Sequence, residues 1–254
     1  MGPIVLEAKS LRKEFAGFVA VDGVDLQVHG GSIHALIGPN GAGKTTTFNL
    51  LTKFISLTAG QLSFKGIDVT GYGPAAIAKL GIVRSFQISA IFPSLTLAEN
   101  LQIALQLLEK KSFVFWRKSE FNDWTRSRID ELLTQVGLAQ DANMTAGEIS
   151  YGKRRALEIA TTLALEPELM LLDEPMSGLG LEDIERISGI IAGFKGKKTV
   201  LMVEHNLSVV ANISDKITVL ARGKKIAEGA YADIAQNDEV QTAYLGTAHK
   251  ASHA

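Results

Sequence analysis

The chain has 254 residues, of which 46% are hydrophobic and 21% charged, as in an ordinary soluble globular domain. Its 26 Lys and Arg residues nearly balance 27 Asp and Glu residues, which argues against a nucleic-acid-binding protein with a basic surplus. Cysteine is absent, which excludes disulfides and thiol-dependent metal or catalytic sites. No apolar run approaches the about 20 residues of a membrane-spanning helix, so we expect any membrane role to come through a partner.

The first third of the sequence has the pattern of β-strands. Short, partly alternating segments predict half-buried strands at residues 4–8, 23–28 and 61–65. Residues 33–37 are almost wholly apolar, which favours a central strand covered on both faces. This strand runs directly into a glycine-rich turn, and a helix is predicted to begin near Lys44.

The middle of the chain changes to a helical pattern. Apolar spacings of three and four predict helices at residues 97–109 and 124–136, within a mostly helical lobe inserted at about 88–165. A basic run between these helices is interleaved with aromatic residues, which permits contact with nucleic acid or a membrane surface; a solvated lobe is the simpler interpretation. The run comprises Lys110, Lys111, Phe113, Phe115, Trp116, Arg117 and Lys118.

After Pro167 strands and helices alternate again. A buried strand is predicted at 169–172, a helix at 182–194, a second buried strand at 199–203, and a hairpin at 216–220 and 225–228. This alternation indicates a mostly parallel sheet with helices on both faces. Residues 248–254 are predicted to form a frayed tail.

The glycine-rich turn fits the phosphate-binding pattern G-x-x-x-x-G-K-[ST] at every fixed position of residues 38–45. In such a turn, backbone N–H groups surround phosphate oxygens and the next helix points its positive dipole end at the anion. The alternative is an ordinary glycine-rich strand-to-helix turn. The residues expected to hold ATP are Asn40, Gly41, Ala42, Gly43, Lys44, which reaches the β- and γ-phosphates, Thr45, which also binds Mg²⁺, and Thr46.

Two acidic residues, Asp173 and Glu174, end the apolar strand predicted at 169–172. Because α/β sheets bind ligands at the carboxyl edge, both carboxylates are expected there. Asp173 suits Mg²⁺ through a water molecule, and Glu174 suits polarising the attacking water, unless both acids only cap the loop before Pro175. His205 ends a neighbouring strand, where it can bond the γ-phosphate or simply be a surface residue.

Together these residues resemble the ATPase domain of ABC transporters, over nearly the whole chain. The deciding segment is 149–153, Ile-Ser-Tyr-Gly-Lys, which precedes a predicted helix at 154–165 and resembles the family signature Leu-Ser-Gly-Gly-Gln. The resemblance implies an α/β P-loop NTPase core with a mostly parallel sheet, an N-terminal antiparallel β subdomain and an inserted helical lobe. It also implies a head-to-tail dimer, in which Ser150 and Gly152 of one subunit contact the ATP of the other.

This sequence departs from the family pattern in two segments. In the signature, Ile149 replaces Leu, Tyr151 replaces Gly and Lys153 replaces Gln. Tyr151 is compatible with ATP binding if its ring points away from the nucleotide. In the loop at 177–180, which crosses the dimer interface in the family, Gly180 stands in place of the usual Asp, so that contact is missing.

The resemblance assigns further roles. Phe15 takes the place of the aromatic residue that stacks on adenine, with Phe18 as a competing candidate, and either is also a plausible core residue. Gln87, in the segment 84–87, resembles the glutamine that touches Mg²⁺ and the attacking water, and His205 takes the switch position. The expected catalytic residues are Glu174, His205, Gln87 and Lys44, and the expected metal ligands are Thr45, Gln87 and Asp173.

Segments 84–87, 150–152 and 174–179 resemble the ATPases of branched-chain amino acid importers. Importers of urea or amides and lipopolysaccharide exporters are the alternatives within the family. A soluble ABC ATPase is a second class, against which the absence of a second domain, a coiled coil or a basic excess argues. A third class is a non-hydrolysing regulatory module, against which Glu174 and His205 argue.

The resemblance also implies partners and organisation. We expect permease subunits, a second ATPase subunit that is a copy or a paralogue, an indirect link to a solute-binding protein, no nucleic acid, and a place on the cytoplasmic face of the membrane. The whole chain is expected to form one ABC ATPase domain, with its core at 1–87 and 166–247, the helical subdomain at 88–165 and the tail at 248–254. Residues 87–97, with Ile91, Phe92 and Pro93 exposed, are expected to meet the permease, unless they form a buried turn.

Overall fold

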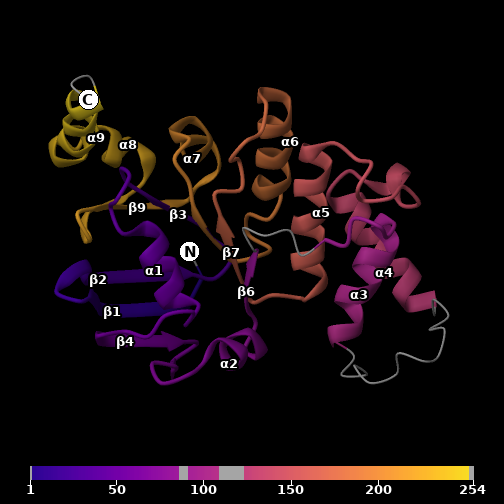
Figure 1. Cartoon of the computed structure of the whole chain (residues 1–254), viewed down its shortest axis with the longest axis horizontal. Helices are drawn as coiled ribbons and strands as arrows, with labels where there is room; N and C mark the ends of the chain where they lie inside the picture. The colour runs from indigo at the N-terminus through magenta and orange to yellow at the C-terminus, as the bar shows by residue number, and fades with distance from the viewer. Residues whose placement is uncertain (1, 86–90, 109–122, 252–254) are drawn as a thin grey trace.

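The computed structural model describes residues 2–85, 91–108 and 123–251, which contain two β-sheets and surrounding helices (Figure 1). The first sheet is antiparallel, with its strands in the order β2-β1-β4-β5. These strands are β1 (Ile4–Phe15), β2 (Phe18–His29), β4 (Ala59–Phe64) and β5 (Ile67–Asp68).

The second sheet has the order β10-β9-β3-β8-β7-β6 and is parallel from β9 to β6, whereas β10 pairs with β9 as an antiparallel hairpin. It confirms the mostly parallel α/β core. Its strands are β3 (Ile33–Ile37), β6 (Ile82–Ser85), β7 (Leu169–Asp173), β8 (Val200–Val203), β9 (Lys216–Ala221) and β10 (Lys224–Gly229).

The parallel sheet is buried on both faces, as the apolar composition of residues 33–37 predicts. Ile33, Ala35 and Ile37 of β3 belong to a core cluster that also contains buried residues of the helices that follow β6 in the chain. Leu36 belongs to a second cluster, which includes α1 (Lys44–Leu51) and the antiparallel sheet. Because neighbouring residues of a strand point to opposite faces, the sheet forms the layer between two hydrophobic cores.

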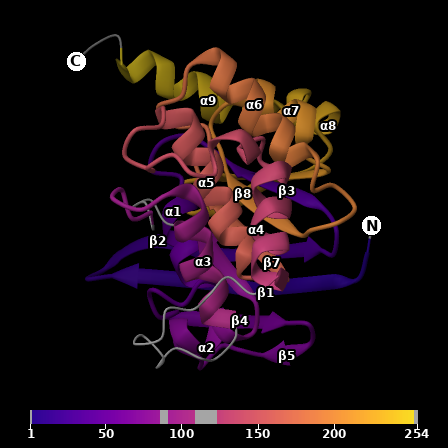
Figure 2. The ribbon, with the colours of Figure 1, turned by 90° about the vertical axis from the view of Figure 1, so that its right-hand side faces the viewer.

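Among the described residues between β6 and β7, three helices lie beside the β6 edge, which confirms the inserted helical lobe (Figure 1). They are α3 (Leu97–Leu108), α4 (Asp123–Gln135) and α5 (Tyr151–Ala164), with the 3₁₀ turn η1 (Ala139–Asp141). The limits proposed for the lobe stay a prediction. The other helices are α2 (Pro74–Lys79), α6 (Leu181–Ala192), α7 (Leu207–Ile213), α8 (Tyr231–Ala235) and α9 (Asp238–Ala251). Helices α6 to α9 lie at the opposite end of the molecule from α2 and β5 (Figure 2).

The lengths of the first strands and the C-terminal tail differ from the sequence predictions. Strands β1 and β2 are longer than predicted, because a register shift between Ala8 and Leu11, where Ser10 has a φ of 49°, interrupts the alternation used for prediction. Residues 248–251, which were predicted to belong to a frayed tail, form the end of α9. The basic run at 110–118 and residues 252–254 lie outside the described residues. Across the described ranges, no helix has both the length and the hydrophobicity to cross a membrane.

Candidate functional site

The glycine-rich turn connects the carboxyl end of β3 to α1, and two of its glycines are required by sterics. Gly38 and Gly43 have φ values of 151° and 96°. A Cβ on Gly38 would lie 2.1 Å from the backbone oxygen of Leu220, and one on Gly43 would lie 2.7 Å from that of Ala20. Side chains are therefore excluded at both positions, and the turn keeps its tight path.

Lys44 begins α1 and folds back over the turn. Its Nζ donates hydrogen bonds to the backbone oxygens of Gly38, at 2.6 Å, and Pro39, at 3.1 Å. Burial lowers the pKa of Lys44, and the negative charge of Glu174 opposes that shift. The ammonium group is thus held at the turn by oxygen atoms, the same kind of partner that a phosphate offers.

The remaining predicted ligands of this loop flank Lys44 in the sequence and differ in exposure. Asn40 and Gly41 are exposed, Ala42 is buried, Thr45 is exposed and Thr46 is half-buried. The first turn of α1 itself contains no acidic residue, so the helix does not offset its own positive dipole end. These features make the turn suitable for binding an anion. The role of each of these residues in binding ATP stays a prediction.

The two predicted carboxylates follow one another at the carboxyl end of β7. Asp173 is only 2% exposed, and Glu174 is half-buried. The Glu174 N–H donates to the backbone oxygen of Val203 in β8, at 3.0 Å. Its φ of 46° is unfavourable for a residue with a side chain and must be maintained by its surroundings. Because β3 and β7 both pair in parallel with β8, Glu174 after β7 and the glycine-rich turn after β3 lie at the same edge of the sheet.

Arg84, at the end of β6, binds the Asp173 side chain. Its Nη2 lies 2.5 Å from Asp173 Oδ2, and its Nη1 donates to Asn49 Oδ1 at 2.6 Å. The guanidinium also lies 5.6 Å from the ring centre of Phe48 and 5.7 Å from that of Phe54. A cation therefore already neutralises the buried carboxylate. From the sequence, Arg84 was recognised only as part of a motif; the available signal was a charged residue within a short apolar segment.

Arg155 of α5 binds the backbone of the same turn, and the sequence analysis missed it. Its Nε donates to the oxygen of Pro175 at 3.0 Å, and its Nη2 donates to those of Asp173, at 3.1 Å, and Glu174, at 2.9 Å. Its Nη1 donates to Glu158 Oε2 at 2.7 Å. One side chain thus connects α5 to three successive carbonyl groups.

Glu204, which directly follows β8, is fully buried and was also missed. Its Oε1 accepts a hydrogen bond from the Met176 N–H at 3.0 Å. Its Oε2 accepts from the N–H groups of His205, at 2.9 Å, and Asn206, at 3.0 Å. This carboxylate joins the segment after Glu174 to the segment that carries His205. The available signal was an acid directly after the apolar segment 200–203 and directly before the candidate His205.

The signature-like segment begins α5. Ser150 is the N-cap, and its Oγ accepts a hydrogen bond from the Lys153 N–H at 3.3 Å. Lys153 Nζ pairs with Asp141 at 2.8 Å, so its charge is used within the helical lobe. The Tyr151 hydroxyl donates to the backbone oxygen of Ser177 at 3.5 Å. Its ring therefore lies along the loop at 177–180 of its own subunit.

Comparison with known proteins decides the family. The profile described as ABC transporter matches residues 21–177, and the one described as branched-chain amino acid ATP-binding cassette transporter matches residues 224–250. The chain belongs to the ABC transporter family. Among its relatives is the high-affinity branched-chain amino acid transport ATP-binding protein BraF of Pseudomonas aeruginosa, which is 36% identical over 96% of this chain and 98% of its own. LivG of Escherichia coli, with the same description, is 36% identical over 98% of this chain and 100% of its own.

Solved ABC cassettes have the same fold. The ADP conformation of MJ1267, an ATP-binding cassette of an ABC transporter, superposes with a TM-score of 0.84 and 29% identity, covering 96% of this chain and 99% of that one. A dimeric post-hydrolysis state of the cassette MJ0796, bound to ADP and Pi, gives a TM-score of 0.73 and 25% identity, covering 89% and 98%. The α/β cassette fold predicted from the motifs is therefore confirmed.

Of the remaining ABC motif residues, Phe15, Phe18 and His205 lie within the described part of the chain and Gln87 does not. Phe15 and Phe18 are paired neighbours in the hairpin of β1 and β2 and are 45% and 68% exposed, so neither is a core residue. Lys13 Nζ lies 4.9 Å from the Phe15 ring centre. His205 is exposed. Gln87 lies outside the described residues.

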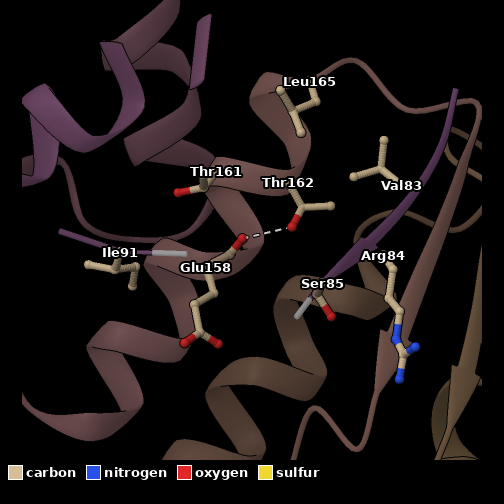
Figure 3. Close-up of a pocket in the computed structure, with 8 residues that line it drawn as sticks. All are labelled: Val83, Arg84, Ser85, Ile91, Glu158, Thr161, Thr162 and Leu165. Atoms are coloured by element: carbon tan, nitrogen blue, oxygen red, sulfur yellow. Dashed lines mark hydrogen bonds between the residues drawn. The ribbon is translucent and has the colours of Figure 1, made fainter. Parts of the chain in front are cut away.

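A pocket of about 60 Å³ lies between β6 and α5 in this ABC cassette (Figure 3). Val83, Arg84 and Ser85 line it from β6. Ile91 also lines it but is only 7% exposed, which contradicts the predicted exposure, because its side chain packs into the core of the lobe. Phe92 and Pro93 are exposed as predicted. The opposite wall consists of Glu158, Thr161 and Thr162 of α5, together with Leu165, which directly follows that helix.

Proposed function

We propose that this chain is the ATPase subunit of an ABC importer for branched-chain or other hydrophobic amino acids. The observation that carries the hydrolytic role is the position of Glu174 after β7, at the carboxyl edge of the sheet where the Lys44 loop follows the parallel strand β3. The relatives BraF and LivG, together with the family match at residues 224–250, support the solute class.

In this proposal, ATP is the substrate and the N–H groups of the glycine-rich turn bind its phosphates. Lys44 exchanges its two carbonyl partners for β- and γ-phosphate oxygens. Glu174 polarises the attacking water, and His205, with Gln87, helps to hold that water and the γ-phosphate. Phe15, or its neighbour Phe18, stacks on adenine.

A magnesium ion fits the residues present. Asp173 is a buried carboxylate that already balances one positive charge, that of Arg84. Thr45 is exposed in the first turn of α1, and hard oxygen ligands such as a carboxylate and a hydroxyl suit Mg²⁺. Asp173, Thr45 and Gln87 would hold the ion, which neutralises phosphate charge when it is bound.

We further propose that two cassettes pair head to tail, so that Ser150 and Gly152 meet ATP bound by the other cassette. The dimeric MJ0796 structure supports this arrangement. A permease segment is proposed to dock at the pocket between β6 and α5, beside the exposed residues Phe92 and Pro93. This arrangement places the chain on the cytoplasmic face of the membrane.

The test is reconstitution with the permease subunits in proteoliposomes. We expect ATP-dependent uptake of leucine, isoleucine or valine, in the presence of the matching solute-binding protein, and loss of uptake in the E174Q variant. Uptake of urea or an amide, without amino acid uptake, would refute the solute class and leave the ATPase role standing.

A further inference from the structure

The turn that carries Glu174 is held from outside by side chains. Glu174 has a φ of 46°, and a residue with a Cβ adopts this conformation only when its surroundings maintain it. Its own N–H is fixed to Val203. The direction of its carboxylate therefore depends on how the adjoining carbonyl groups are bound.

Arg155 binds those carbonyl groups. The oxygens of Asp173, Glu174 and Pro175 all accept hydrogen bonds from its guanidinium, at 2.9–3.1 Å. The Arg155 side chain is only 12% exposed. A planar guanidinium presents N–H donors in fixed directions, which the single ammonium group of lysine cannot reproduce.

Glu158 orients Arg155 from the same helix. Its carboxylate accepts from Nη1 at 2.7 Å, three residues further along α5, and its side chain is 11% exposed. Glu158 also lines the pocket between α5 and β6 (Figure 3). On the other wall, Arg84 binds the side chain of Asp173. One wall of the pocket therefore contacts Asp173 directly through Arg84, and the other contacts the turn indirectly, through Glu158 and its partner Arg155.

We propose that Arg155 is a positioning residue for Glu174, and that Glu158 makes this positioning respond to what occupies the pocket. Filling the pocket displaces the Glu158 carboxylate, which changes the direction of the Arg155 guanidinium and hence the orientation of Glu174. The second part rests on the proposed function, in which a permease segment is the occupant.

The first experiment uses the isolated full-length chain. R155K is expected to lower kcat for ATP hydrolysis by about 10- to 100-fold, with KM for ATP little changed, because binding groups stay in place while the carboxylate is misdirected. R154K, at the adjacent position of the same helix, is the matched control and is expected to retain wild-type kcat.

A double-mutant cycle separates positioning from general damage. If Arg155 acts through Glu174, R155K lowers the residual activity of E174Q by much less than it lowers that of the wild type. Equal losses in both backgrounds, or an unchanged kcat in a folded R155K variant, would overturn the proposal.

The second experiment compares the free chain with the assembled transporter. E158Q is expected to keep a measurable basal rate of ATP hydrolysis, but adding the permease should leave that rate unchanged. The wild-type chain, by contrast, should hydrolyse ATP faster when the permease is present. Full stimulation in E158Q overturns the link to the pocket. If the wild-type chain neither binds the permease nor is stimulated, the proposed function fails instead, and the cycle of Arg155 with Glu174 still decides the positioning role.

Discussion

Replacing Glu204 with glutamine tests the contact between the catalytic segment and the His205 segment. The Glu204 carboxylate accepts three N–H groups, from Met176 on one oxygen and from His205 and Asn206 on the other. Glutamine has the same size but only one acceptor oxygen, and its NH₂ group only donates. If the oxygen keeps its two partners, the NH₂ group faces the N–H of Met176, so that two donors oppose each other.

The expected cost follows from this single lost acceptor. Leaving one buried N–H without a partner costs about 1–3 kcal/mol. We therefore expect E204Q to lower the free energy of unfolding by about 1–3 kcal/mol, and to lower Tm by about 2–4 °C for each kcal/mol. Since Met176 lies two residues after Glu174, kcat for ATP hydrolysis should also fall while ATP binding is retained.

Urea unfolding followed by far-ultraviolet circular dichroism measures the free energy, and phosphate release measures kcat. The matched control is E185Q, which alters an exposed glutamate of α6 and should change stability by less than about 0.5 kcal/mol. An E204Q variant as stable as E185Q, with wild-type turnover, would refute the reasoning.

Three other perturbations have defined outcomes. E174Q should retain nucleotide binding, measured by equilibrium dialysis, and lose about 10²- to 10⁴-fold in phosphate release if Glu174 polarises the water; near-wild-type turnover would contradict that role. G38A should abolish nucleotide binding or folding, both visible in a thermal shift assay with ATP, because its Cβ would lie 2.1 Å from the Leu220 oxygen; a stable, binding variant would be inconsistent with the turn. Burial lowers the pKa of His34 to about 4, so the unfolded chain binds this proton first as the pH falls. Stability from this group is full above about pH 6.5 and declines towards pH 4 by about 1.4 kcal/mol per unit; H34Q should flatten that decline in urea titrations.

Local patterns were sufficient for the parts of this molecule that repeat a fixed chemistry. The strand at residues 33–37 was predicted with the correct bounds, because a strand covered on both faces is apolar throughout. The turn at 38–45 was predicted because Gly38 and Gly43 leave no room for side chains. Asp173 and Glu174 were placed because parallel strands expose their carboxyl ends at one edge.

Long-range contacts could not be predicted from one sequence. Arg84 and Asp173, or Arg155 and Pro175, are brought together only by the fold, and no spacing along the chain encodes these pairs. Ile91 was expected on the surface together with Phe92 and Pro93, but it packs inward; whether one apolar residue does so depends on the tertiary core. The extent of β1 was underestimated for a similar reason, since pairing across a bulge is not visible in periodicity.

The position of β3 in its sheet determines when the site can assemble during synthesis. Ile33 pairs with Val200 of β8, and Ala35 pairs with Ile217 of β9. Both neighbours of this early strand are therefore synthesised only in the last third of the chain. The antiparallel sheet of β1, β2, β4 and β5, by contrast, is complete within the first 68 residues. A nascent chain that stops before residue 199 can pair its N-terminal hairpin, but it leaves the strand ahead of Gly38 without neighbours. Premature termination therefore removes the nucleotide site entirely, even when every residue of the glycine-rich turn has been made.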